Sequence, residues 1–197
     1  MSSPHVWIPP EDVVRAGEAV TGITYRWGDD LPEGVQRPVT PATDAFRDWI
    51  VANVKGVPAV GTVRPSNRRT GGRDPHLNGY AADIMIRNSD PVVGDAVANW
   101  LVAHAKALGL QYVLWSRTEW TAKGSRGRWG VGTYGGTNPH TDHVHVELGV
   151  EARAVSRETM TARLNAARTD SWLALAVPFV TLAAVAAFVF GFGQAGA

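Results

Sequence analysis

Two short segments that contain histidine and aspartate, far apart in the sequence, constrain this chain more than any other feature. The first runs from His76 to Asp83, and the second, from His140 to His145, holds three of the six histidines. Each lies at the start of, or inside, a stretch whose residues predict a β-strand. Histidine and carboxylate side chains are common metal ligands, so we expect the fold to bring the two segments together around a metal ion.

Charge and cysteine content exclude several classes of protein. The chain has 19 basic and 18 acidic residues, and the basic ones are scattered except around residues 68–73. A nucleic-acid footprint normally needs a concentrated basic face, so we predict no nucleic-acid partner. Because the chain has no cysteine, disulfides, thiolate zinc sites and cysteine nucleophiles are excluded. A bound metal must be held by nitrogen and oxygen atoms.

The 197 residues give room for one domain and an appendage. Residues 1–40 are rich in proline and predict an N-terminal arm, with a short helix that begins near Pro10. We predict the main domain over residues 41–150 and a linker helix over residues 151–171.

Periodicity predicts four strands and two helices within the main domain. The helices start at Pro41 and after Asp90, and they end at Gly56 and Gly109. The strands are predicted within residues 57–64, 79–86, 111–115 and 143–148. The glycine-rich run over 123–138 is predicted to be a long loop, and loops of that length are usually functional or disordered. The rings around it either pin this loop or line a substrate groove: Trp115, Trp120, Trp129 and Tyr134.

The end of the chain is apolar. From Trp172 to Gly193 there is no charged residue, and Thr181 is the one ordinary polar side chain. A run of about twenty apolar residues can span a bilayer as a helix. The alternative is a core helix, but a helix that is apolar on all faces has nowhere to pack in so small a domain. We predict a transmembrane helix over residues 172–193 that anchors the chain in a lipid bilayer, and no secretory signal peptide.

The spacing of His143 and His145 suggests that the two histidines have different roles. A catalytic zinc typically takes three protein ligands and leaves a fourth position for water. His76, Asp83 and one histidine of the pair His143 and His145 supply that number. Residues two apart on a strand face the same side, so one histidine can bind the metal while the other contacts the reacting group. Asp142 lies where it can take a proton from a metal-activated water.

Two other histidines have different interpretations. His104 lies on the apolar side of the long helix and is predicted to be structural. His140 either flanks the metal site or simply ends the glycine-rich loop.

The pattern His-x-x-Gly-x-Ala-x-Asp over residues 76–83, followed by Asp-His-Val-His over 142–145, resembles the zinc signature of a metallopeptidase superfamily. That superfamily joins lysostaphin, D-alanyl-D-alanine carboxypeptidases and the sonic hedgehog domain. The chain is most similar to the branch of carboxypeptidases and L-alanyl-D-glutamate endopeptidases, in a form common in actinobacteria and their phages. The resemblance covers residues 57–149 and implies an antiparallel sheet. The expected fold class is therefore α+β: a small antiparallel sheet of about four strands with flanking helices, plus the C-terminal transmembrane helix.

The resemblance also implies roles for individual residues. His76, Asp83 and His145 would bind Zn²⁺, and Asp142, three residues before the last ligand, would be the general base. Many relatives have glutamate at that position, but some peptidases of the L-alanyl-D-glutamate type have aspartate, so activity is still expected.

Two further roles follow from the same resemblance. His143 would orient the substrate or stabilise the transition state. Arg64 stands where relatives keep an arginine that stabilises the oxyanion, and such a donor contributes a few kcal/mol where it exists. Ser66 is a weaker candidate.

The sequence thus predicts a zinc-dependent peptidase that hydrolyses an amide bond in the stem peptide or cross-link of bacterial peptidoglycan. One alternative is a zinc-binding but inactive cell-wall-binding domain, and another is a structural membrane protein of a virion. The arginines before the apolar run place the domain in the cytoplasm by the positive-inside rule, away from the wall. A phage lysis or virion-associated enzyme, in the virion or the infected-cell membrane and with virion proteins as partners, resolves this conflict.

Overall fold

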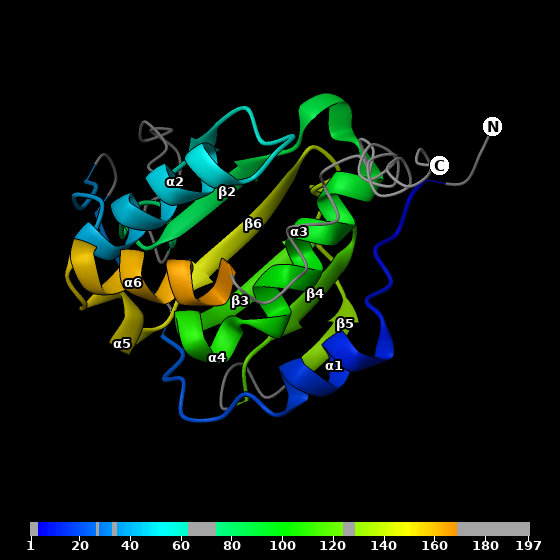
Figure 1. Cartoon of the computed structure of the whole chain (residues 1–197). Coiled ribbons are helices and arrows are strands. Elements are labelled where there is room, and N and C mark those ends of the chain that lie inside the picture. Colours follow the sequence, from blue (N-terminus) through cyan, green and yellow to red (C-terminus); the bar gives the residue numbers. More distant parts are fainter. Residues whose placement is uncertain (1–3, 27, 33–34, 63–73, 124–128, 169–197) are drawn as a thin grey trace, which may run out of the picture.

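The structure, a computed structural model, describes residues 4–26, 28–32, 35–62, 74–123 and 129–168. Its centre is an antiparallel sheet of six strands in the order β1-β2-β6-β3-β4-β5 (Figure 1). The sixth strand in the sequence therefore lies in the middle, between β2 and β3. The strands are β1 Val60–Gly61, β2 Ala81–Met85, β3 Leu110–Trp115, β4 Thr118–Thr121, β5 Gly130–Thr133 and β6 His143–Leu148.

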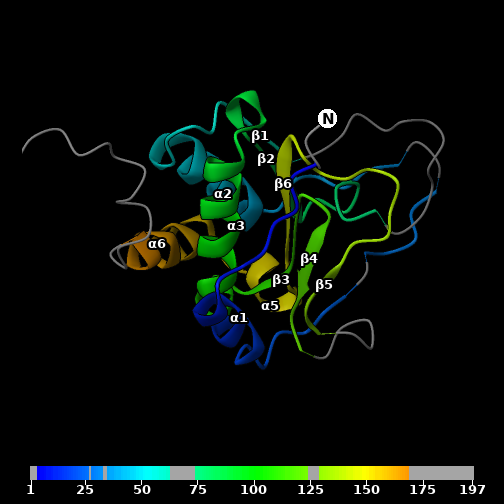
Figure 2. The same ribbon diagram turned by 90° about the vertical axis from the view of Figure 1, so that its right-hand side faces the viewer.

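Helices α1, α2, α3 and α6 lie on one side of this sheet (Figure 2). The helices are α1 Glu11–Glu18, α2 Pro41–Asn53, α3 Pro91–Ala103, α4 Ala105–Leu108, α5 Val150–Arg153 and α6 Arg157–Arg168, with a 3-10 turn at Arg87–Ser89. Both longer predicted helices start as their sequences indicate. The Thr40 side chain accepts a hydrogen bond from the backbone N–H of Thr43, and Asp90 does the same for Val92. Such caps satisfy N–H groups that have no partner inside the helix.

The predicted long helix over residues 91–108 is interrupted near its end. His104 has a non-helical backbone conformation between α3 and α4. Gly109 then ends α4 in the left-handed region, with φ +71°, a conformation that glycine adopts at little cost. The His104 ring hydrogen-bonds the Trp100 carbonyl at 2.9 Å. The His104 side chain thus packs at the break between the two helices.

The hydrophobic core lies between the sheet and these helices. Along β6, the side chains of Val144, Val146 and Leu148 are completely buried in it. Helix α6 adds Met160 and Leu164 to the same core. Every second residue of β6 therefore faces the helices, which leaves the intervening residues for the opposite face of the sheet.

The N-terminal segment runs along the domain and includes the short helix expected near Pro10. The Trp7 side chain is buried, and its Nε1 donates a hydrogen bond to Asn99 of α3 at 2.9 Å. The Trp7 backbone N–H donates to the Ser116 carbonyl. This segment is thus held to the main domain by both packing and hydrogen bonds.

The predicted fold class is wrong in its number of strands, because β4 and β5 were not expected. Strand β4 follows β3 through a tight turn at Ser116 and Arg117, whose φ angles are +41° and +66°. Asparagine and glycine are the usual sequence signal for such a turn, and both are missing here. Strand β5 has the sequence Gly-Val-Gly-Thr, which has low β-propensity, and it lies inside the predicted loop over residues 123–138.

The transmembrane helix in the predicted fold class is not among the elements that the structure describes. Among the described residues, no helix combines the length and the apolar character needed to cross a membrane. The segment 172–193, to which the membrane helix and the bilayer anchor were assigned, lies outside the described residues. The last described helix is α6, which packs against α2 and α4.

Candidate metal centre

Asp83 and His145 meet because they are directly paired across two central strands. In the antiparallel register of β2 and β6, the two residues are opposite one another. Both side chains point to the face away from the helices, and His145 Nδ1 lies 2.9 Å from Asp83 Oδ1. The predicted alternation along residues 143–148 therefore does place this histidine against the carboxylate.

His76 reaches the same point from the turn that precedes β2. Its backbone N–H donates to the Asp74 side chain at 2.8 Å, and the turn continues to Gly79, whose φ is +76°. A Cβ atom at Gly79 would overlap the carbonyl oxygen of Pro38. Only glycine combines this backbone conformation with so close an approach. The His-x-x-Gly spacing thus has a physical reason, because the tight turn delivers His76 to the sheet.

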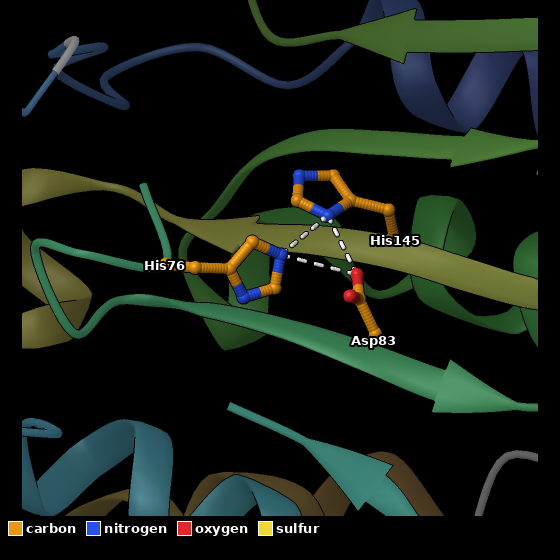
Figure 3. Close-up of side chains that lie close together, drawn as sticks. All are labelled: His76, Asp83 and His145. Atoms are coloured by element: carbon orange, nitrogen blue, oxygen red, sulfur yellow. Dashed lines mark hydrogen bonds and ion pairs between the residues drawn. The ribbon is translucent and has the colours of Figure 1, made fainter. Parts of the chain in front are cut away.

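Three potential ligand atoms converge at this point (Figure 3). His76 Nε2 lies 3.1 Å from Asp83 Oδ1 and 3.2 Å from His145 Nδ1. Ligand atoms around a tetrahedral zinc ion with bonds of about 2.0–2.1 Å lie about 3.3 Å apart. The three atoms are therefore spaced on the scale that a single zinc ion requires.

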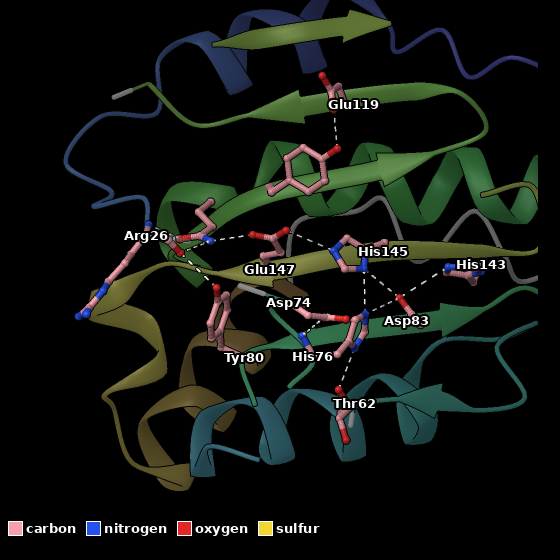
Figure 4. Close-up of polar contacts among 12 residues, drawn as sticks. Arg26, Thr62, Asp74, His76, Tyr80, Asp83, Glu119, His143, His145 and Glu147 are labelled. Atoms are coloured by element: carbon pink, nitrogen blue, oxygen red, sulfur yellow. Dashed lines mark hydrogen bonds and ion pairs between the residues drawn. The ribbon is translucent and has the colours of Figure 1, made fainter. Parts of the chain in front are cut away.

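The outward ring nitrogens of both histidines face oxygen acceptors (Figure 4). His76 Nδ1 lies 2.8 Å from the Thr62 carbonyl oxygen, and His145 Nε2 lies 3.4 Å from Glu147 Oε1. A carbonyl and a carboxylate only accept, so these ring nitrogens carry the protons and donate them. When both rings are neutral, His76 Nε2 and His145 Nδ1 are then left with lone pairs. Metal-binding histidines show this arrangement in general, and the donor set of two nitrogens and one oxygen fits zinc.

The charges around the cluster favour a cation. Burial raises the pKa of the Asp83 carboxyl, but hydrogen bonds with His145 and His76 outweigh burial and hold the pKa well below its usual range. Burial lowers the pKa of His145, yet its hydrogen bonds with Asp83 and Glu147 raise it to about 9. A positive charge is therefore stabilised here, whether a protonated ring or a metal ion carries it.

Asp142 and His143 lie beside the cluster and are bonded to each other. Asp142 Oδ1 accepts a hydrogen bond from His143 Nδ1 at 2.7 Å, although the Asp142 side chain is 61% exposed. His143 is buried, and its Nε2 lies 3.6 Å from Asp83 Oδ1. This Nε2 has no hydrogen-bond partner among the described residues. A buried nitrogen without a partner, facing the cluster, is suited to contact a reacting group.

His140 also belongs to the site, which decides between the two interpretations left open by the sequence. Its ring centroid lies 4.7 Å from that of His143 and 5.9 Å from that of His145. Burial lowers the pKa of His140 to about 4, so its ring is neutral at pH 7. A neutral ring beside the cluster adds no charge that would oppose a metal ion.

A cavity of about 380 Å³ opens beside His76, His140 and His145, and Tyr134 forms part of its wall. The four aromatic residues around the predicted loop lie in different parts of the structure. Trp115 and Trp120 are buried in the core, whereas Trp129 is half exposed and has Lys123 over its ring. The cavity is lined by Asp74, Pro75, His76, Tyr112, Leu114, Tyr134, Asn138, His140, His145 and Glu147.

Two predicted site residues lie outside the described residues, and one residue of the site was not predicted from the sequence. Arg64 and Ser66 lie within residues 63–73, which are not among the described residues. Glu147 was not predicted. Its signal was present, because it continues the two-residue spacing of His143 and His145 on the same face of the strand.

Comparison with known families gives one match. The family model described as "VldE, C-terminal domain" matches residues 35–145, more than half of the chain. Both segments that contribute to the candidate metal centre lie within that range. No curated protein and no solved structure matches the chain.

Proposed function

We propose that this chain, which belongs to the VldE C-terminal domain family, is a zinc-dependent peptidase that hydrolyses an amide bond in bacterial peptidoglycan. The observation that carries the proposal is the convergence of His76, Asp83 and His145 beside the bonded pair of Asp142 and His143. The substrate class is proposed from the resemblance of this signature to those of peptidoglycan peptidases.

His76, Asp83 and His145 would hold the zinc ion. Two histidines and one carboxylate are a ligand set of catalytic zinc sites, which keep a fourth position open. Zinc in such a site polarises a carbonyl group and lowers the pKa of a water molecule to near neutrality. The cavity, which His76 and His145 line, would give a peptide segment access to that position.

Asp142 and His143 would move the proton. In this proposal Asp142 is the base that accepts a proton from the attacking water, as its position before the last ligand predicts. Its hydrogen bond from His143 Nδ1 also fixes that ring, so that Nε2 faces the cluster. A carboxylate that orients a histidine in this way stabilises positive charge on the ring. Arg64 is still predicted to stabilise the oxyanion.

The decisive experiment treats purified peptidoglycan with the zinc-loaded full chain and identifies the released fragments by mass spectrometry. New amino or carboxyl ends in the stem peptide or cross-link would support the proposal and identify the bond. Asp142→Asn should slow release by about 10²–10⁴-fold, the usual contribution of a general base, while zinc binding is retained. An Asp142→Asn variant with undiminished release would contradict the proposed role of Asp142.

A zinc-binding but inactive wall-binding domain is the second candidate. The exposure of Asp142, whose bonded oxygen faces His143 rather than the three ligand atoms, favours it. This candidate requires bound zinc and sedimentation with peptidoglycan, but no released fragments. The predicted phage lysis or virion-associated role stays a prediction for either candidate.

A further inference from the structure

We infer that Glu147 is a positioning residue for the metal centre, which holds the His145 ring so that Nδ1 faces the metal. The inference rests on the proposed function, because it assigns a role to Glu147 only if the cluster binds zinc. It goes beyond that function by naming a residue outside the ligands and the proton-transferring pair.

The first support is the contact between Glu147 and the far side of the His145 ring. Glu147 Oε1 lies 3.4 Å from His145 Nε2, while His145 Nδ1 lies 2.9 Å from Asp83 on the opposite side. The ring is therefore held between two carboxylates. When Nδ1 binds a metal, the Nε2–H becomes more acidic, so its hydrogen bond to a carboxylate strengthens.

The second support is that Glu147 is itself held in place. Gln111 Nε2 donates to Glu147 Oε2 at 2.7 Å, so each oxygen of the carboxylate has a partner of its own. The Gln111 side chain also accepts from the Arg26 backbone N–H at 3.2 Å and donates to the Arg26 carbonyl at 3.3 Å. The ring of His145 is thus connected through Glu147 and Gln111 to the N-terminal segment. Figure 4 shows Glu147 on the side of the His145 ring that faces Arg26.

An irregularity in the sheet creates this connection. Between Leu110 and Tyr112 the register of β3 shifts by one residue against β6. In a regular strand Gln111 and Tyr112 would point to opposite faces. The bulge instead gives Gln111 access to Glu147 while Tyr112 still pairs with Glu147 across the strands. Bulges are frequently found where a side chain must be re-aimed near a functional site.

Because Glu147 is buried, a carboxylate without a functional role would be energetically unfavourable at this position. Glu147 is almost completely buried, and a buried charge is unfavourable unless it is paired and hydrogen-bonded. The apolar alternative, which the same strand uses at Val146 and Leu148, would avoid that cost. A role in orienting His145 supplies a reason for keeping the carboxylate.

The test is zinc affinity, measured on the full chain by competition with a chelator. Glu147→Gln should weaken zinc binding about 10–100-fold, the usual effect of losing the partner of a metal-binding histidine. Glu119→Gln is the matched control, because Glu119 lies on neighbouring β4 and accepts from the Tyr112 hydroxyl, and among the described residues it has no hydrogen bond to His76, Asp83 or His145. Its zinc affinity should equal that of the wild type.

A second measurement does not depend on a variant that folds. In the zinc-loaded wild type, the NMR signals of the His145 ring should show a proton on Nε2 and metal bound at Nδ1. Metal bound at Nε2, or unchanged zinc affinity in Glu147→Gln, would overturn the inference while leaving the proposed zinc site intact. A wild-type chain that binds no zinc would instead overturn the proposed function, and the role of Glu147 with it.

Discussion

The two faces of β6 are both buried, yet they are built from opposite kinds of side chain. Val144, Val146 and Leu148 are 0% exposed and face the helices, whereas His143, His145 and Glu147 are 3–7% exposed and face away from them. One strand, with a strict two-residue alternation, thus contributes to the core on one side and to the candidate metal centre on the other.

The two faces of β6 have different energetic requirements. The apolar face needs only close contact with other apolar groups, so Ala82 and Val113, which pair with Val146, suffice. On the polar face a buried group is costly unless it is hydrogen-bonded. His145 meets this requirement through Asp83 and Glu147. We infer that function, rather than stability, explains the polar side chains.

The largest effect should come from a charge on the wrong face. Val146→Asp places a carboxylate in the apolar core, where an unpaired ion costs several kcal/mol. Because a domain is stable by only about 5–15 kcal/mol, we expect the variant not to fold. Circular dichroism would show whether the variant folds. A folded Val146→Asp variant with wild-type stability would contradict the proposed difference between the two faces.

The next effect concerns zinc on the polar face. At a free zinc concentration of about 1,000 times Kd, binding should stabilise the wild type by about 4 kcal/mol. His145→Ala should lose that stabilisation, because one of three ligands is gone. Thermal unfolding with and without zinc measures it. If zinc stabilised His145→Ala as much as the wild type, His145 would not be a ligand.

A smaller effect is expected from a cavity on the apolar face. Val144→Ala removes two buried carbon atoms and should cost about 2–3 kcal/mol of unfolding free energy. Zinc affinity should be unchanged, since the side chain faces the helices. Urea unfolding and a zinc titration test both parts. A marked loss of zinc affinity would mean that the faces are coupled.

The smallest effect should come from the edge of the polar face. Glu119→Gln alters one hydrogen bond, to Tyr112, and should cost about 1 kcal/mol or less. The midpoint of urea unfolding measures this cost. A larger loss would show that the polar network contributes more to stability than the proposed division between the faces allows.

The residues that converge at the site were largely predictable from the sequence. His76, Asp83 and one histidine of the pair His143 and His145 could be named from local patterns, whereas the choice of His145 came from the resemblance to the peptidase signature. Glu147 was not predicted, although it continues the same alternation, and His140 was left with two interpretations. The contact of Glu147 with Gln111 depends on a bulge, and the place of His140 depends on how the preceding segment folds back.

The strands were less predictable than the helices. Thr40 and Asp90 indicate helix starts through local hydrogen bonds, and both helices start as expected, although the second is interrupted at His104. Strands β4 and β5 are stabilised mainly by pairing with neighbours. Their short sequences carry little signal without knowledge of those neighbours.

Zinc content of the purified chain tests the proposed metal centre most directly. We expect one zinc ion per chain for the wild type and none for Asp83→Ala or His76→Ala after dialysis. His5→Ala is the control, because His5 pairs with Asp95 and takes no part in the cluster, and it should keep the metal. A wild type without zinc, or Asp83→Ala and His76→Ala variants that keep zinc, would contradict the proposed metal centre.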